Sequence, residues 1–372
     1  MKLSFIADGK LFFKRTDNVE EIKSQFVEDL ILKLEKSEKL SAWKQESTNP
    51  MSPSVWGGQA RASQQIYPRF IDVCKGEEGF IFYLINYSEV TALFKYELET
   101  KVETRLFHKN NFPLRSIDYS SENKEFIGSF VEEDGSSNLI VLNEDGRMLN
   151  SITAGDSLDL NPSFCRKNPD LIFYSSAGIA RDEMGNYLAH DIFSLHSIDK
   201  KTMQADDIYR GETNSLVPKT NKSGELFFIS SPYKGAPKVT IIQQLKNIVL
   251  FPFYFVGAIY NFLKVFTQIF NHDRVEAGAA QQTKKEKEIN LLGEWVNCSK
   301  LKKNKQGEIN LVPESWVLCS HDGATILELK KHINAFDINT DSFVYTNGFK
   351  LIDKLSDKLI HKEKLVEKVC LL

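Results

Sequence analysis

The sequence has almost no excess charge of either sign. Its 47 Lys and Arg residues nearly balance its 50 Asp and Glu residues, which leaves a formal net charge of -3 at pH 7. Domains that bind nucleic acid usually carry a strongly basic face. The composition therefore predicts no nucleic-acid partner.

Cysteine is scarce, and the few cysteines are scattered. They show neither C-x-x-C spacing nor a Cys/His cluster, and they stand at Cys74, Cys165, Cys298, Cys319 and Cys370. This pattern favours reduced, buried thiols over disulfides or a metal site. At the N-terminus, MKLSFIADGKLFFKR places Asp8 and a turn before any apolar run of signal-peptide length, so we expect a cytoplasmic location.

The common catalytic and nucleotide-binding signatures are also missing. The sequence lacks G-x-S-x-G, H-E-x-x-H, the P-loop and G-x-G-x-x-G. His190 and His321 are each followed by an aspartate, but neighbours in a strand point to opposite faces and chelate a metal poorly. We therefore predict no catalytic residue, no cofactor and no metal, and we favour a protein that is not an enzyme.

What the sequence does contain is a recurring pattern of a polar turn followed by an apolar strand. Residues 160–176, LNPSFCRKNPDLIFYSS, are one copy, and related segments occur at residues 114–130, 215–231 and 333–348. The apolar strands are marked by Phe12-Phe13, Phe82-Tyr83, Phe126-Ile127, Phe173-Tyr174, Phe227-Phe228 and Val344-Tyr345. Most neighbouring marks lie roughly 45 to 55 residues apart, close to the period of a four-stranded propeller blade.

This repetition predicts an all-β fold, a β-propeller with six four-stranded blades and an inserted hydrophobic helix. Five or seven blades are alternatives, and a sandwich or barrel explains the repeated pattern less well. Asp8-Gly9 predicts a tight hairpin, which we expect beside the C-terminal strands. Residues 19–39 have helical periodicity, although VEEIKSQ at their start also suits a strand, and residues 43–58 suggest a loop.

The repeated pattern resembles the WD-type repeat of TolB-like six-bladed propellers, P-x-(F/W)-S-P-D-G-K-x-(I/L)-x-(Y/F)-x-(S/T). One copy matches at Pro162, Phe164, Ile172, Tyr174 and Ser176. Another matches at Pro218, Gly224, Leu226, Phe228 and Ser230. CRKNPD and TNKSG stand in place of the S-P-D-G-K core. The resemblance implies a TolB-like propeller fold and carries no activity with it.

A segment of different composition divides the chain. We expect residues 1–235 and 289–372 to form the two parts of the propeller, with residues 236–288 inserted between them. Residues 248–263 carry no charge. Pro252 suits the first position of a helix, and about 20 residues from there could reach across a bilayer core. The side expected to face a membrane or a partner consists of Phe251, Phe255, Ile259, Phe262, Val265, Phe266, Ile269 and Phe270.

The other side of the expected helix is a thin polar stripe. It consists of Gly257, Asn261, Lys264, Gln268 and Asn271. A single crossing would place the two parts of one propeller on opposite sides of a membrane, so we expect the helix to lie along an interface. The interface is a membrane surface, at the inner face of the membrane, or a protein: the chain's own propeller, another partner, or a second copy in a homodimer.

Three functions follow from these features. The favoured one is a non-enzymatic binding scaffold that associates peripherally with a membrane through the inserted helix. The second is an enzyme, a hydrolase or lyase, with a site in the mouth of the propeller channel, where Asp159, Arg181, Asp182 and Asp191 on or near the loop 175–191 are candidate ligand residues. The third is a soluble scaffold that uses the helix for self-association.

Overall fold

The computed structural model of the chain describes residues 1–16, 18–46, 68–233, 235, 288–291, 294–297, 311–340 and 342–372. The chain divides into two compact units. The first comprises Met1–Leu34, Ile66–Tyr233 and Lys287–Leu372, and the second comprises Glu35–Gln65 and Lys234–Glu286. All of the described strands belong to the first unit. The insertion predicted at residues 236–288, with its helix, lies outside the described residues.

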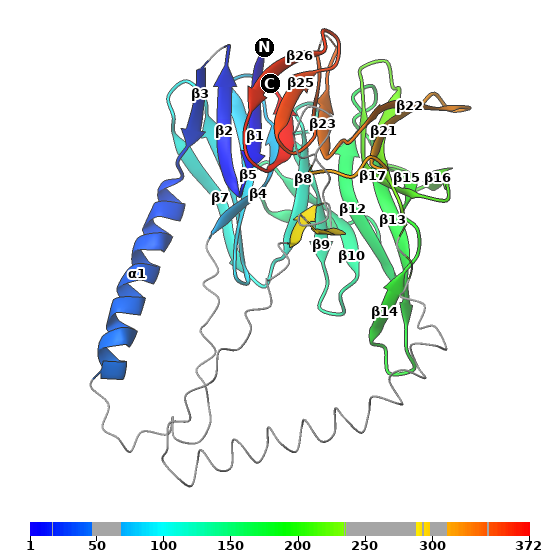
Figure 1. The fold of residues 1–372 in the computed structure, drawn as a ribbon. Coiled ribbons are helices and arrows are strands. Elements are labelled where there is room, and N and C mark those ends of the chain that lie inside the picture. Colours follow the sequence, from blue (N-terminus) through cyan, green and yellow to red (C-terminus); the bar gives the residue numbers. More distant parts are fainter. Residues whose placement is uncertain are drawn as a thin grey trace, which may run out of the picture. The chain divides into compact units, whose positions relative to one another are not determined.

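The first strand group joins the two ends of the chain. Its order is β27 (Val366–Leu371), β1 (Lys2–Ala7), β2 (Lys10–Arg15) and β3 (Asn18–Ile22). β1 and β27 are antiparallel, and Figure 1 shows the N- and C-termini close together at this sheet. Asp8 and Gly9 both have positive φ, 49° and 72°, as the tight turn between β1 and β2 requires.

Three further groups follow in chain order. The second group is β4 (Arg69–Lys75), β5 (Phe80–Tyr87), β6 (Val90–Glu97) and β7 (Glu103–Asn110). The third is β8 (Leu114–Ser120), β9 (Glu125–Val131), β10 (Ser137–Asn143) and β11 (Met148–Ser151). The fourth is β12 (Ser157–Phe164), β13 (Leu171–Arg181), β15 (Ser194–Asp199) and β16 (Ala205–Tyr209), with β14 (Tyr187–His190) extending β13. A parallel bridge from Ser137 to Leu158 joins the third and fourth groups into one sheet.

The remaining strands complete the described part of the first unit. The fifth group is β17 (Asn214–Thr220), β18 (Leu226–Ser231), β21 (Val317–His321) and β22 (Ile326–Lys331). The sixth is β23 (Ala335–Ile338), β24 (Phe343–Thr346), β25 (Lys350–Asp353) and β26 (Lys358–Lys362). A separate hairpin consists of β19 (Glu288–Leu291) and β20 (Glu294–Asn297).

Alternating side chains of each second strand enter different hydrophobic clusters. In β5, Ile81, Tyr83 and Ile85 pack with the first group, whereas Phe82 and Leu84 pack with the third. Successive residues of a strand point to opposite faces, so a strand buried on both faces reads as a continuous apolar run. The other core clusters of the described residues likewise join neighbouring groups along the chain. The cluster of Leu3, Phe5, Ala335 and Val344 joins the sixth group to the first.

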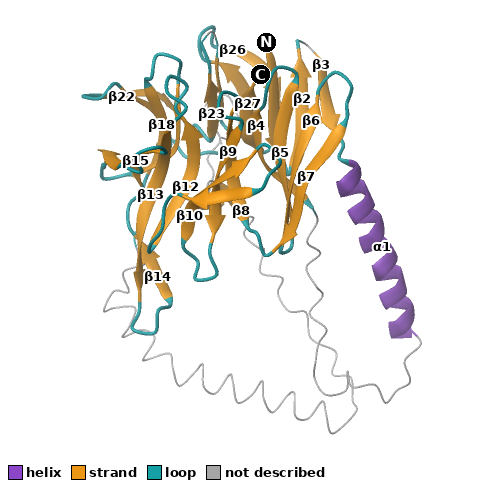
Figure 2. Cartoon of the chain, turned by 180° about the vertical axis from the view of Figure 1, so that it is seen from behind, coloured by secondary structure: helices purple, strands orange, loops and turns teal. Residues whose placement is uncertain are grey.

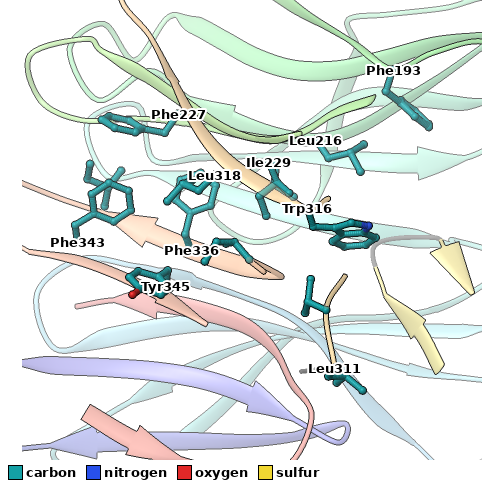
Figure 3. Close-up of a cluster of buried hydrophobic side chains, with 14 of the residues drawn as sticks. Phe193, Leu216, Phe227, Ile229, Leu311, Trp316, Leu318, Phe336, Phe343 and Tyr345 are labelled. Atoms are coloured by element: carbon teal, nitrogen blue, oxygen red, sulfur yellow. The ribbon is translucent and has the colours of Figure 1, made fainter. Parts of the chain in front are cut away.

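The cluster between the fifth and sixth groups also buries the segment that leads into β21. Trp316 is 1% exposed, and Leu311 and Val312 are buried with it; Figure 3 shows Trp316 within this cluster. Gly348 has a φ of 89°, and a Cβ there would lie 2.8 Å from Leu311 Cδ2. This packing fixes the point at which the chain returns to the fifth group.

The helix α1 (Gln25–Glu46) begins later and ends later than residues 19–39, the range with helical periodicity. Residues 19–22 of that range belong instead to strand β3, which agrees with the strand alternative for VEEIKSQ. Ser24 starts the helix, because its Oγ accepts a hydrogen bond from the Val27 N–H and its carbonyl accepts one from Glu28. Figure 2 shows α1 in purple. Residues 43–46 belong to α1, and the rest of the predicted loop, to residue 58, lies outside the described residues.

Two sequence predictions need correction. Phe12 and Phe13 lie in β2, the third strand of its group, whereas the other five marks lie in second strands. The reason is that the first strand of this group, β27, comes from the C-terminal end of the chain. Residues 175–191 form an extended hairpin of β13 and β14 rather than a loop, with Arg181 paired to Tyr187.

Candidate functional site

A central cavity of about 50 Å³ is lined by the first strand of each group, which we call the innermost strand. In the described part of the chain, each of the six groups contributes one such strand: β27, β4, β8, β12, β17 and β23. A cavity of this size has room for a few water molecules.

Three ion pairs occupy the cavity. Lys368 Nζ lies 3.4 Å from Asp72 Oδ1, Arg166 Nη2 lies 3.4 Å from Asp118 Oδ1, and Lys219 Nζ lies 2.8 Å from Asp337 Oδ1. The first pair joins β27 to β4, the second joins β8 to the turn that follows β12, and the third joins β17 to β23. Each pair therefore connects two neighbouring strand groups.

The three aspartates also accept backbone hydrogen bonds from the next group. The Ile117 N–H donates to Asp72 at 2.9 Å, the Phe164 N–H donates to Asp118 at 2.9 Å, and the Leu371 N–H donates to Asp337 at 2.7 Å. All three aspartates are buried. Buried carboxylates are tolerated where they are paired and hydrogen-bonded, and this arrangement meets both conditions.

The electrostatics of the cavity stabilise charged bases and neutral thiols. Asp118 raises the pKa of Arg166 above its usual value, against the opposing effect of burial. Burial alone would lower the pKa of Lys219, but the contact with Asp337 leaves it raised. Burial raises the pKa of Cys74 and Cys370, which also line the cavity. A thiol with a raised pKa is a poor nucleophile at neutral pH.

A second hollow, of about 220 Å³, lies where several innermost strands end. Lys75, Arg166 and Lys222 line it together with Glu122 and Asp337. Its charges are mixed, and Asp337 is already engaged by Lys219 and Leu371.

The four residues predicted at the channel mouth have separate partners. Asp159 is buried and accepts a hydrogen bond from Ser176 Oγ at 2.6 Å. Arg181 pairs with Asp156 and Asp134, and Asp182 accepts hydrogen bonds within its own turn, including one from the Met184 N–H. Asp191 pairs with Arg210 at 2.6 Å. The described lining of the central cavity contains none of the four.

Sequence reasoning missed a chain of hydrogen bonds on the fourth group. Ser194 Oγ lies 2.8 Å from His196 Nε2, and His196 Nδ1 lies 2.8 Å from Asp207 Oδ1. A carboxylate can only accept, so Nδ1 carries a proton, and in the neutral imidazole Nε2 is free to accept from the Ser194 hydroxyl. The same hydroxyl also lies 3.3 Å from the Ser176 carbonyl oxygen. Ser194 and His196 stand two apart in β15 and therefore share a face. That spacing was visible in the sequence, but the pairing of β15 with β16 was not.

This order of groups is that of a hydrolase triad, which is recognised by geometry. The environment of the carboxylate differs from that of a hydrolase triad, in which the aspartate is buried, because the Asp207 side chain is 87% exposed. Tyr174 stacks on His196 with ring centroids 5.5 Å apart.

Two kinds of site are missing from the described part of the chain. Among the described residues, no group of three or more His, Cys, Asp or Glu side chains is placed to hold a metal ion. Within those residues there is also no helix with the length and apolar character needed to cross a membrane.

No protein-family model and no curated protein matches the sequence. Solved structures do match. TolB from Acinetobacter baumannii has a TM-score of 0.52 at 8% identity, over 99% of this chain and 66% of that chain. A chain of the nidogen/laminin complex has a TM-score of 0.50 at 7% identity, over 99% of this chain and 97% of that one. A weaker match is oligogalacturonate lyase in complex with manganese. It has a TM-score of 0.34 at 11% identity, over 62% of this chain and 58% of that chain.

The antiparallel groups and these neighbours define a β-propeller. Its fold is similar to that of TolB, as the repeated sequence pattern implied. This chain spans about two thirds of the TolB chain, 66%. Identities this low establish the fold and do not carry an activity.

Proposed function

We propose that the chain is a non-enzymatic β-propeller scaffold that associates peripherally with a membrane, at its cytoplasmic face, through residues 236–288. The observation that carries the first part is the central cavity, whose volume is about 50 Å³. Small-molecule sites usually measure several hundred Å³ and keep a few polar groups free for the ligand. Here three ion pairs engage six of the eight charged side chains of the cavity lining and join the strand groups.

The blade number belongs to the same proposal. We assign one blade to each of the six strand groups and the first blade to both ends of the chain. The support is the set of core clusters of the described residues: most lie between two successive groups, and one joins β1 and β27 to β23 and β24. A propeller closed in this way has no exposed edge between its first and last blades.

The membrane part of the proposal rests on the apolar sequence and on where the insertion attaches. β18 and β21, the strands of the fifth group that come before and after residues 232–316, are antiparallel partners, with Ser230 opposite Val317. The segment that contains the insertion therefore begins and ends at neighbouring strand ends, which a single crossing of a bilayer would not allow. A helix with a wide apolar face and a polar stripe lies in the plane of a membrane surface.

Liposome flotation of the full chain tests this association with matched variants. Phe255→Glu/Ile259→Glu/Phe262→Glu places three charges on the expected membrane side. Asn261→Glu/Gln268→Glu/Asn271→Glu places the same three charges on the polar stripe. We expect the first variant to stay in the soluble fraction and the second to float like the wild type. Equal flotation of all three proteins would refute the membrane association.

Self-association through the same residues is the competing use of the insertion. Sedimentation of the full chain without lipid separates the two. A monomer that floats with liposomes supports membrane association. A dimer that the Phe255→Glu/Ile259→Glu/Phe262→Glu variant dissociates, and that does not float, supports a dimerisation arm.

One observation favours a second candidate function, hydrolysis. Ser194, His196 and Asp207 stand in the order of an activated nucleophile, its base and the group that orients the base. A fluorophosphonate probe, which labels activated serines, tests this directly. Labelling of the wild type that is lost in both Ser194→Ala and His196→Ala would establish a hydrolase. Absence of labelling would count against hydrolysis and leave the scaffold as the proposed function.

A further inference from the structure

A groove of about 1090 Å³ lies between the second and third strand groups of the first unit. It is formed by the turn after β5, the approach to β8, the end of β9 with its following turn, and the approach to β12. Its size suits a peptide segment better than a single ion or a small metabolite.

The described lining of this groove is acidic. Glu89, Glu132, Glu133, Asp134 and Asp156 line it, and the described lining contains no Lys, Arg or His. Arg181, outside the lining, neutralises part of this charge by pairing with Asp134 at 2.9 Å and Asp156 at 2.7 Å. The three glutamates make no ion pair with any described residue.

The groove also offers an apolar surface beside a carboxyl group whose pKa is lowered. Hydrogen bonds from the Ser136 hydroxyl and N–H, with a smaller effect of Arg181, hold the pKa of Asp134 below its usual value. Phe130 and Pro113 supply apolar lining. An aromatic ring beside carboxylates suits a Lys or Arg side chain, whose stem is apolar and whose head is cationic.

An independent observation points to a missing hydrogen-bond donor in the groove. Asn138 lines it and is 8% exposed. Its Nδ2 donates to Glu132 Oε1 at 3.1 Å, and because a carboxylate only accepts, this contact fixes the orientation of the amide. Oδ1 is then buried and accepts no hydrogen bond from the described residues. A buried acceptor without a donor is unfavourable, and a donor from a bound molecule would satisfy it.

We propose that this groove binds a basic peptide segment of a partner protein. Its Lys or Arg side chains pair with Glu89, Glu132 and Glu133, and their stems lie along Phe130. A turn of the Asn138 side chain toward the groove brings the buried Oδ1 to an N–H of the bound segment. The inference rests on the proposed scaffold function and names the class of partner. Acidic side chains around a polar, wide groove give selectivity by charge, and the resulting affinity falls as salt rises.

The test uses the full chain and a fluorescein-labelled (Lys-Ala)5 peptide, with affinity measured by fluorescence anisotropy at low and at physiological salt. The groove variant is Glu89→Gln/Glu132→Gln/Glu133→Gln. The control is Glu77→Gln/Glu78→Gln/Glu212→Gln, which removes three exposed charges outside the groove. Thermal unfolding checks that both variants fold.

We expect the groove variant to raise Kd about tenfold, since three partly exposed pairs are lost, and to show a weaker salt dependence. The control should change Kd by less than about twofold. A Kd of the groove variant within twofold of the wild-type value would overturn the proposal that the groove binds a basic peptide. An equal increase in the Kd of the control variant would overturn it as well. Flotation is read separately, so failure of the groove and failure of the membrane association are distinct results.

Discussion

Lys219 and Asp337 join the fifth and sixth strand groups through an ion pair, with Nζ 2.8 Å from Oδ1. The two residues are 118 positions apart in the sequence. Asp337 also accepts a hydrogen bond from the Leu371 N–H, so it connects three strands from three groups. The same side chains that could have formed a ligand site thus hold the innermost strands together.

Breaking this pair should be costly. Lys219→Met leaves Asp337 buried without its cation, and we expect a loss of about 3 kcal/mol in the free energy of unfolding. Lys219→Met/Asp337→Asn removes both charges and should recover at least about 1 kcal/mol of that loss. Urea denaturation of the wild type, both single variants and the double variant measures the coupling. Additive losses would show that the pair contributes nothing to stability.

The contact between β27 and β1 predicts a strong effect at Leu371. Leu371 is buried in the cluster between the sixth and first groups, so Leu371→Ala should cost about 3 kcal/mol. Leu359, in β26, is half-exposed, and Leu359→Ala should cost less than about 0.5 kcal/mol. Denaturant midpoints compare the two. Equal small losses would mean that the last strand does not help to hold the sheets together.

The thiols offer a third test. Burial raises the pKa of Cys319 to about 11 and also raises those of Cys74 and Cys370, and Cys165 is buried as well. In a Cys298→Ser background, all four should resist Ellman's reagent at pH 8 in the folded chain and react fully in denaturant. Mass spectrometry locates any modified thiol. Rapid native modification of Cys74 or Cys370 would show that the central cavity is open.

The turn at Asp322 predicts a specific dependence on pH. Hydrogen bonds from the Thr325 and Ala324 N–H groups and from the Thr325 hydroxyl lower the pKa of Asp322 to about 2. A lowered carboxyl pKa stabilises the folded state above the unfolded value near 4 and loses this effect as the pH falls toward 2. The stability difference between wild type and Asp322→Ala should therefore shrink across that window. A difference at Asp322 that is constant from pH 5 to pH 2 would contradict the assignment.

The sequence predicted what local chemistry determines. Asp8-Gly9 marked its hairpin, because few dipeptides suit two positive φ angles. The apolar runs marked strands buried on both faces. The first repeat was aligned one strand too late, since nothing local shows that β27 supplies the innermost strand.

The site was less predictable for the same reason. Asp72 and Lys368, or Asp118 and Arg166, meet only after distant strands assemble. Residues 175–191 looked too long for a hairpin because their polar composition hid the pairing of Ala180 with Ala189. The hydrogen bonds of Ser194 and His196 with Asp207 depend in the same way on the contact of β15 with β16.

The central claim is that this propeller acts through its insertion and not through its central cavity. Hydrogen exchange of the full chain, with and without liposomes and followed peptide by peptide, tests it most directly. The account predicts added protection within residues 236–288 and unchanged exchange in the innermost strands β4, β8, β12, β17, β23 and β27. Unchanged exchange throughout, or new protection in those strands instead, would contradict it.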